Sequence, residues 1–186
     1  MKKFFITMMM LAGVMLLQAQ VRRAPAQRTQ VQQPQAVVIK ESEPLIVNGR
    51  LAFMGIPVKQ AQATISAKLK EKGFVLKDDS WEGTVYGVKS SLGIEGFDGQ
   101  ADGISYREMK EYTKTQAINR VKALQKAFLE ATGGKVIENT LPNDGVEGEF
   151  VKIEAGKGTI EIQYANEDEV NFESRFFNVI VQFREL

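Results

Sequence analysis

Apolar positions along residues 45–186 recur with two different periods, and the change between them predicts the order of helices and strands. Over residues 58–72 they return every three or four positions, the spacing of one face of an α-helix. The positions that define this face are Val58, Ala61, Ile65 and Leu69. Gly73 stands where a glycine commonly ends a helix, so we expect the first helix to stop there.

A second helix is predicted between residues 113 and 133. Either Thr113 or Thr115 can cap its start with a side-chain oxygen, and Gly133-Gly134 ends it. Its apolar stripe consists of Ile118, Val121, Leu124 and Phe128. The charged residues of the segment fall mainly off this stripe, which predicts a solvated face formed by Lys114, Arg120, Lys122, Lys126 and Glu130.

Short apolar runs separated by glycine-rich turns predict antiparallel strands on either side of the second helix. Before it we expect a strand within residues 45–57, another from Phe74, and several over residues 81–109. After it we expect strands at residues 135–141, 148–155, 158–165 and 176–183, with turns at 142–145, 156–158 and 166–169. The pattern predicts an α+β fold in which two helices pack on one face of an antiparallel sheet.

The two halves of the folded region, residues 45–110 and 111–186, follow a similar order. In each, a leucine (Leu69, Leu129) precedes a helix-ending glycine by four positions, and a Glu-Gly pair (82–83, 147–148) precedes a long strand. A tandem α-β-β-β-β repeat explains these matches. Chance also explains them, because only a few positions agree.

The first nineteen residues have the pattern of a secretory signal peptide. Lys2 and Lys3 precede an apolar run over residues 4–17, and Ala19 lies at the expected cleavage point. The run is shorter than the about 20 residues that span a bilayer, although a retained signal anchor is the alternative. Residues 20–44 are rich in Gln and Pro and lack a hydrophobic period, so we expect a disordered linker before a single domain at residues 45–186.

Composition narrows the classes of function. The chain contains no His and no Cys, which excludes Ser-His-Asp and Cys-His nucleophiles, disulfides, a lipidated cysteine and the usual zinc ligands. Without Lys2 and Lys3, 22 of the 24 basic residues would remain against 23 acidic ones. A chain this close to neutral has no overall field for nucleic acid or anionic membranes. We therefore expect a non-enzymatic periplasmic or secreted protein without cofactor, nucleic-acid partner or stable membrane anchor.

A segment near the start of the folded region resembles a family of small exported Bacteroidetes proteins of unknown function. The matching residues are Phe53, Gly55, Ile56 and Pro57, followed after the first helix by Lys72, Gly73 and Phe74. Residues 158–165 and the alternating strand ending near Phe183 also fit. The family is similar in layout to the β-lactamase-inhibitor-protein fold and to the small lipoprotein of outer-membrane assembly. The resemblance implies a protein-binding module and no catalytic residue.

Carboxylates offer two further hypotheses. Asp98, Gln100, Asp102 and Gly103 match the first ligand positions of an EF-hand loop, but position 12 is Met109, so a glycine-rich hairpin turn is favoured and no metal site is predicted. Paired acids could also hydrolyse a glycan. The available acids are Glu82, Asp98, Asp102, Glu147 and Glu149, and their spacing selects no pair.

Aromatic residues among glycines are the better candidates for a binding surface. Trp81, Tyr86 and Tyr106 lie near Gly83, Gly87 and Gly96, and aromatic side chains over small residues form surfaces that a partner can bury. We expect Trp81 and Tyr106 to be exposed and Phe97 to lie in the core, with either environment open for Tyr86. The leading hypothesis is a soluble protein-binding module of the bacterial envelope. The alternative is a carbohydrate-binding protein or a carboxylate-dependent hydrolase.

Overall fold

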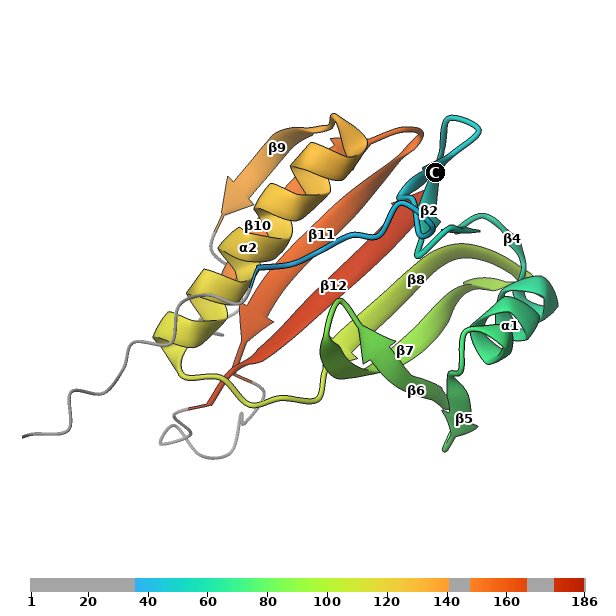
Figure 1. Cartoon of the computed structure of the whole chain (residues 1–186), viewed down its shortest axis with the longest axis horizontal. Helices are drawn as coiled ribbons and strands as arrows, with labels where there is room; N and C mark the ends of the chain where they lie inside the picture. The colour runs from blue at the N-terminus through green and yellow to red at the C-terminus, as the bar shows by residue number, and fades with distance from the viewer. Residues whose placement is uncertain (1–35, 141–147, 167–175, 186) are drawn as a thin grey trace, which may run out of the picture. The chain divides into compact units, whose positions relative to one another are not determined.

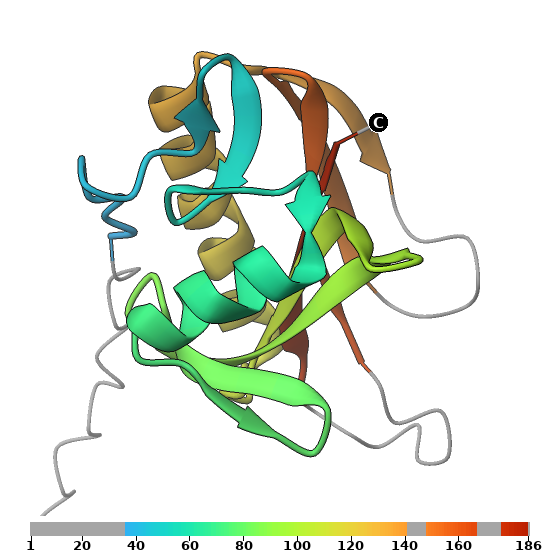
Figure 2. The same ribbon diagram turned by 90° about the vertical axis from the view of Figure 1, so that its right-hand side faces the viewer.

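The computed structural model describes residues 36–140, 148–166 and 176–185. They form an α+β fold, as the sequence predicts, with one long antiparallel sheet, a small sheet and two helices. Figure 1 and Figure 2 show both helices and the small sheet on the same side of the long sheet. The expected turn at 142–145 and Glu147 lie outside the described residues, as do residues 167–169 of the acidic turn.

The long sheet has the strand order β5-β6-β7-β8-β12-β11-β10-β9. Its first half consists of β5 (Val75–Lys77), β6 (Ser80–Val85), β7 (Val88–Phe97) and β8 (Gln100–Glu108). Its second half consists of β9 (Lys135–Thr140), β10 (Gly148–Ala155), β11 (Gly158–Ala165) and β12 (Asn178–Glu185). The final strands of the two halves, β8 and β12, pair antiparallel at the centre. A duplicated unit would give this symmetric order, and common origin of the halves stays a prediction.

The segment before the first helix contains several short strands where one was expected. Strands β1 (Ile46–Val47), β2 (Arg50–Phe53) and β3 (Ile56–Pro57) form the small sheet, and β4 (Gln60–Ala61) pairs with β8. The chain reverses at Asn48-Gly49 and again at Met54-Gly55, where all four residues have positive φ. Asn-Gly is a strong hairpin signal, so the first reversal was readable from the sequence.

Both helices end where predicted, but the first begins later. Helix α1 (Gln62–Glu71) starts after residue 61 because Val58 hydrogen-bonds back to Leu51 and β4 is held extended by β8. Gly73, at φ +86°, terminates it. Helix α2 (Lys114–Thr132) is capped by Thr113, whose side chain accepts from the Gln116 amide, and it ends at left-handed Gly133.

The core lies between the long sheet and the elements that cover it. Helix α2 packs on β10, β11 and β12, strand β2 packs on β11 and β12, and α1 contacts β7. At the centre, the ring of Phe183 (β12) lies 5.6 Å from Phe128 (α2) and 5.4 Å from Phe53 (β2). These aromatic contacts join both covering layers to the middle of the sheet.

Packing begins before residue 45. Val37 and Ile39 are partly buried against the core, and Lys72 pairs with Glu43 at 3.6 Å. The folded region therefore includes the last part of the expected linker, since alternate apolar residues of an extended segment can pack without forming a strand. The predicted signal peptide lies outside the described residues. Neither described helix combines the length and the apolar character that crossing a membrane requires.

Candidate protein-binding surface

The side of the long sheet that faces away from both helices is a broad polar surface, here called the open face. Strand alternation assigns its residues, because neighbours of buried positions point to the opposite side. Three rows cross the strands and contain Phe150, Gln163, Ile180, Arg107, Ser91 and Glu82; Lys152, Glu161, Gln182, Ser105 and Gly93; and Glu154, Thr159, Arg184, Gly103 and Glu95. The corresponding inward positions include Val151, Ile162, Val181 and Tyr106, all at most 1% exposed.

Cross-strand ion pairs organise the open face. Lys152 lies 2.7 Å from Glu161, and Arg184 lies 3.0 Å from Glu95, which also accepts from the Gln182 amide. Each side chain keeps some exposure to water, so each pair contributes little stability. Their effect is to hold donors and acceptors in fixed positions and to leave the face with opposite charges close together.

Glu82 is held between two lysines at the other end of the open face. Lys89 lies 3.3 Å and Lys77 3.4 Å from its carboxylate oxygens. The hydrogen bond from Lys89 is the main cause that lowers the pKa of Glu82 from its ordinary value of 4.5, and Lys77 acts in the same direction. Glu82 therefore stays ionised at neutral pH, which suits an ion pair rather than a general acid.

Small residues line the middle of the open face on β7 and β8. Gly93 pairs with Ser105. Ser91 lies two positions before Gly93 on β7 and therefore points to the same side of the sheet. A Cβ placed on Gly93 would meet the Ser105 Oγ at 3.3 Å. In the same rows, the larger residues Arg107, Gln182 and Glu95 neighbour this strip.

The three aromatic residues predicted for a binding surface lie on the other side of the sheet. Tyr106 is 1% exposed, which corrects the expectation that it is accessible. It follows Ile104 by two positions and therefore points inward, where its ring lies 5.9 Å from Phe53. Trp81 pairs with buried Leu92 and packs partly buried against the core. The Tyr86 ring lies 5.5 Å from Phe128 and 6.1 Å from Tyr106, so the two tyrosines meet in the core rather than on an exposed face.

The glycines next to these aromatics do not form hollows either. The ring of Phe74 occupies the space beside Gly83, where an added Cβ would lie 2.1 Å from a ring carbon. Gly96 is approached by the backbone of Gln100, and Gly87 is a turn residue at φ +86°. Core packing therefore explains Gly83, and backbone geometry explains Gly87 and Gly96.

Phe97 was expected in the core, but it lies on the surface. It is 88% exposed and ends β7, opposite Gln100 at the tip of the β7–β8 hairpin. The hairpin end projects from the sheet beside the start of α1, and the Phe97 side chain is left in solvent. Asp98 and Gly99 form the turn with φ of 50° and 72°. The hairpin interpretation of residues 97–103 is confirmed, and in the described segments no cluster of three or more potential metal ligands occurs.

A buried polar network was missed by the sequence analysis. Arg120 of α2 is 8% exposed and bonds to Glu108 of β8, which is fully buried, and Tyr112 donates to the same carboxylate. The helical spacing could have predicted this burial, because Arg120 precedes Leu124 by four positions and therefore lies on the apolar stripe. The expectation of a solvated face is wrong for this residue.

The opposite charges of Arg120 and Glu108 stabilise each other in the buried network. Burial alone would lower the pKa of Arg120, but the hydrogen bonds and charge of Glu108 outweigh burial and raise it. Burial, with the Glu108 charge, raises the pKa of Tyr112. Because Glu108 is sealed from solvent, this network can position α2 but cannot reach a substrate.

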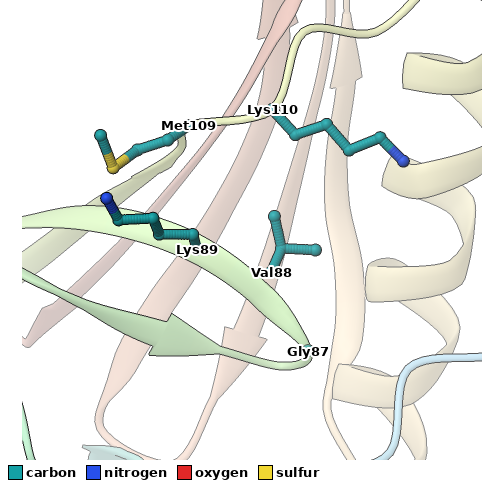
Figure 3. Close-up of a pocket in the computed structure, with 5 residues that line it drawn as sticks. All are labelled: Gly87, Val88, Lys89, Met109 and Lys110. Carbon is teal, nitrogen blue, oxygen red and sulfur yellow. The ribbon is translucent and has the colours of Figure 1, made fainter.

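A surface depression lies at the opposite end of the hairpin from Phe97. Gly87, Val88, Lys89, Met109 and Lys110 line it, and its volume is about 450 Å³. Figure 3 shows the ammonium groups of Lys89 and Lys110 extending to opposite sides of the depression. Lys110 stands 5.1 Å from the Tyr112 ring, and Lys89 pairs with Glu82. The depression therefore has an apolar floor and a basic rim, without convergent acid, base or nucleophile.

No protein-family model, curated protein or solved structure matches this chain. Of the carboxylates considered for hydrolysis, Glu82 lies on β6, away from Asp98 and Asp102 at the hairpin end, and the side chain of Glu149 lies outside the described residues. The open face is suited to broad contact with a partner rather than to enclosing a small molecule.

Proposed function

We propose that the chain is an exported protein-binding module of the bacterial envelope that contacts its partner through the open face. The observation that supports this most directly is the distribution of cover over the sheet. Both helices and the small sheet pack on one side, and the other side presents ordered polar groups to solvent. Export and the bacterial source are part of the proposal, on the evidence of the signal-like N-terminus and the family resemblance.

The dimensions of the open face suit a protein partner. Strands lie about 4.8 Å apart, so the distance from β6 across β7, β8, β12 and β11 to β10 is about 24 Å. A standard protein interface of about 800 Å² per partner is about 28 Å on a side. Alternating charges such as Lys152 and Glu161 would select a partner with complementary charges more than they would add affinity.

The alternative, a glycan-binding protein or carboxylate-dependent hydrolase, has less support. Glycan hydrolysis requires a carboxylic acid with a raised pKa, whereas the pKa of Glu82 is lowered. Sugar binding through stacked aromatics would need accessible rings, and Tyr106 is buried. Protein contact through the open face requires neither.

A pair of arginine substitutions tests the proposal. Ser105→Arg places a large charged side chain in the middle of the open face, whereas Thr64→Arg places the same group on exposed α1. We expect affinity-tagged wild type and Thr64→Arg to recover the same envelope proteins, and Ser105→Arg to lose one of them with its melting temperature unchanged. Equal recovery by Ser105→Arg, or binding to a glycan array without any protein partner, would contradict the proposal.

A further inference from the structure

The β7–β8 hairpin ends in an exposed aromatic residue with acidic neighbours. Phe97 has the highest exposure, 88%, among the large apolar side chains of the described segments. A ring that stays in water forgoes the favourable free energy of burying its apolar surface. In Figure 2 the end of this hairpin projects from the sheet. We call residues 97–102 the tip.

The tip is held rigidly. Its turn residue Gly99 accepts a hydrogen bond from the Gln62 amide at 2.9 Å, which ties it to the start of α1. Strand β4 adds ladder pairs on the outer side, with Gln60 opposite Ala101 and Ala61 opposite Gln100. A group already fixed in place loses little conformational entropy when it binds, so the tip is suited to act as an anchor.

The tip carries only negative charge. Asp98 and Asp102 are exposed on either side of Gly99, and residues 95–106 contain no Lys or Arg. Glu95, just before the tip, is neutralised by Arg184. A surface that receives Phe97 should therefore combine an apolar floor with separated cationic groups.

The depression at the other end of the same hairpin has these properties. We call its residues, Gly87, Val88, Lys89, Met109 and Lys110, the socket. Val88 and Met109, the latter 47% exposed, supply the apolar floor, and a methionine adapts its shape to an aromatic ring. Because the ammonium groups of Lys89 and Lys110 diverge, they can meet two acids that lie on either side of a ring rather than a single anion.

The existing contacts of the two lysines do not prevent this. Lys89 pairs with Glu82 but is 66% exposed, and such a surface pair contributes little stability. The Lys110 ammonium lies 5.1 Å from the centre of the Tyr112 ring, and an exposed contact of this kind is weak. Both side chains can therefore turn toward acidic groups at small cost.

A tip cannot reach the socket of its own chain. Phe97 and Val88 are the two ends of β7, and a strand of this length separates them by about 30 Å. We propose that Phe97 of one copy inserts into the socket of a second copy, with Asp98 and Asp102 facing Lys89 and Lys110. This self-association uses the two ends of the β7–β8 hairpin rather than the middle of the open face, which it meets only where Lys89 pairs with Glu82.

The proposal predicts concentration-dependent association of the purified chain. The contact is smaller than a standard interface, so we expect weak association. In sedimentation velocity, the fraction of oligomers should increase as the protein concentration is raised from about 10 μM to about 1 mM. Phe97→Ala should weaken association by roughly 10- to 100-fold, as truncation of a buried aromatic anchor does. The control variant Phe176→Ala removes a half-exposed ring elsewhere on the molecule and should leave self-association unchanged.

Charge exchange tests the pairing of tip and socket directly. A tip variant (Asp98→Asn with Asp102→Lys) and a socket variant (Lys89→Gln with Lys110→Glu) should each fail to self-associate. Their equimolar mixture should associate again, because the unmodified tip of the socket variant then meets the unmodified socket of the tip variant, while the two exchanged surfaces also carry opposite charges. A chain that stays monomeric up to about 1 mM, unchanged association of a folded Phe97→Ala variant, or a mixture that stays monomeric would each overturn the proposal.

Discussion

Arg120 on α2 donates two hydrogen bonds to one carboxylate oxygen of Glu108 on β8, from Nε at 2.8 Å and from Nη2 at 2.6 Å. The same Nη2 also donates to the Tyr86 carbonyl at 3.2 Å. This pair joins the second helix to the last strand of the first half and to the β6–β7 turn. A buried charge pair specifies one arrangement of these elements, because removing either partner leaves the other uncompensated.

The first prediction concerns this pair. Arg120→Met should lower the free energy of unfolding by about 3–5 kcal/mol, because Glu108 would remain buried without its partner. Urea denaturation followed by circular dichroism measures the loss. Adding Glu108→Leu to the variant should recover much of the stability, since no buried charge remains. A double variant less stable than Arg120→Met would contradict this account.

The second prediction compares two buried tyrosine hydroxyls. The Tyr112 hydroxyl donates to Glu108, whereas the Tyr106 hydroxyl is buried without a hydrogen-bond partner in the described structure. Tyr112→Phe should cost about 1–3 kcal/mol, because a charged acceptor loses its donor. Tyr106→Phe should be neutral or stabilising, because it removes an unsatisfied polar group. Thermal unfolding of the two variants under the same conditions measures this difference, and equal losses of stability would contradict the prediction.

The third prediction concerns alkaline pH. Burial raises the pKa of Tyr86 and Tyr106, and burial with the Glu108 charge raises that of Tyr112, all from an ordinary value of 10.0. A raised folded-state pKa means that the stability contribution is complete below pH 10 and is lost as pH rises further. The folded protein should therefore form less tyrosinate near pH 10 than the urea-denatured chain. Identical titration curves in absorbance would exclude this behaviour.

The fourth prediction compares two strand glycines. Gly83→Ala would bring a Cβ to 2.1 Å from the Phe74 ring, so the core must shift, at a cost of about 1–3 kcal/mol. Gly93→Ala, on the open face, brings its Cβ no closer than 3.3 Å to the Ser105 Oγ and should change stability much less. Chemical denaturation of both variants measures the difference. A larger loss for Gly93→Ala would show that the Phe74 contact is not limiting.

Several local features could be predicted because nearby residues specify them. The Thr113 cap, the glycines that end both helices and the Asp98-Gly99 turn each depend on a few consecutive residues. Helical and strand periods gave the α+β class for the same reason. The later start of α1 was not predictable, because the extended conformation of residues 60–61 depends on pairing with distant β8.

The candidate sites were harder to predict. Residues 104–108 alternate Ile, Ser, Tyr, Arg and Glu, so one set must face inward, but alternation alone does not say what covers that side. The inward set includes Tyr106 and Glu108, and Arg120 provides the charge that allows Glu108 to be buried. Phe97 has the apolar character of a core residue, yet it lies at the projecting end of the hairpin and is exposed.

The sequence by itself determined where both helices end, where the second begins, the helix-and-sheet class, and the absence of histidine and cysteine chemistry. These properties follow from local backbone preferences, side-chain periods and composition. The tertiary structure decided that β8 meets β12, which face of the sheet stays open, and that the Phe97 tip and the Met109 socket lie at opposite ends of one hairpin. Such relationships depend on contacts between residues far apart in the chain, whose free energies no local pattern contains.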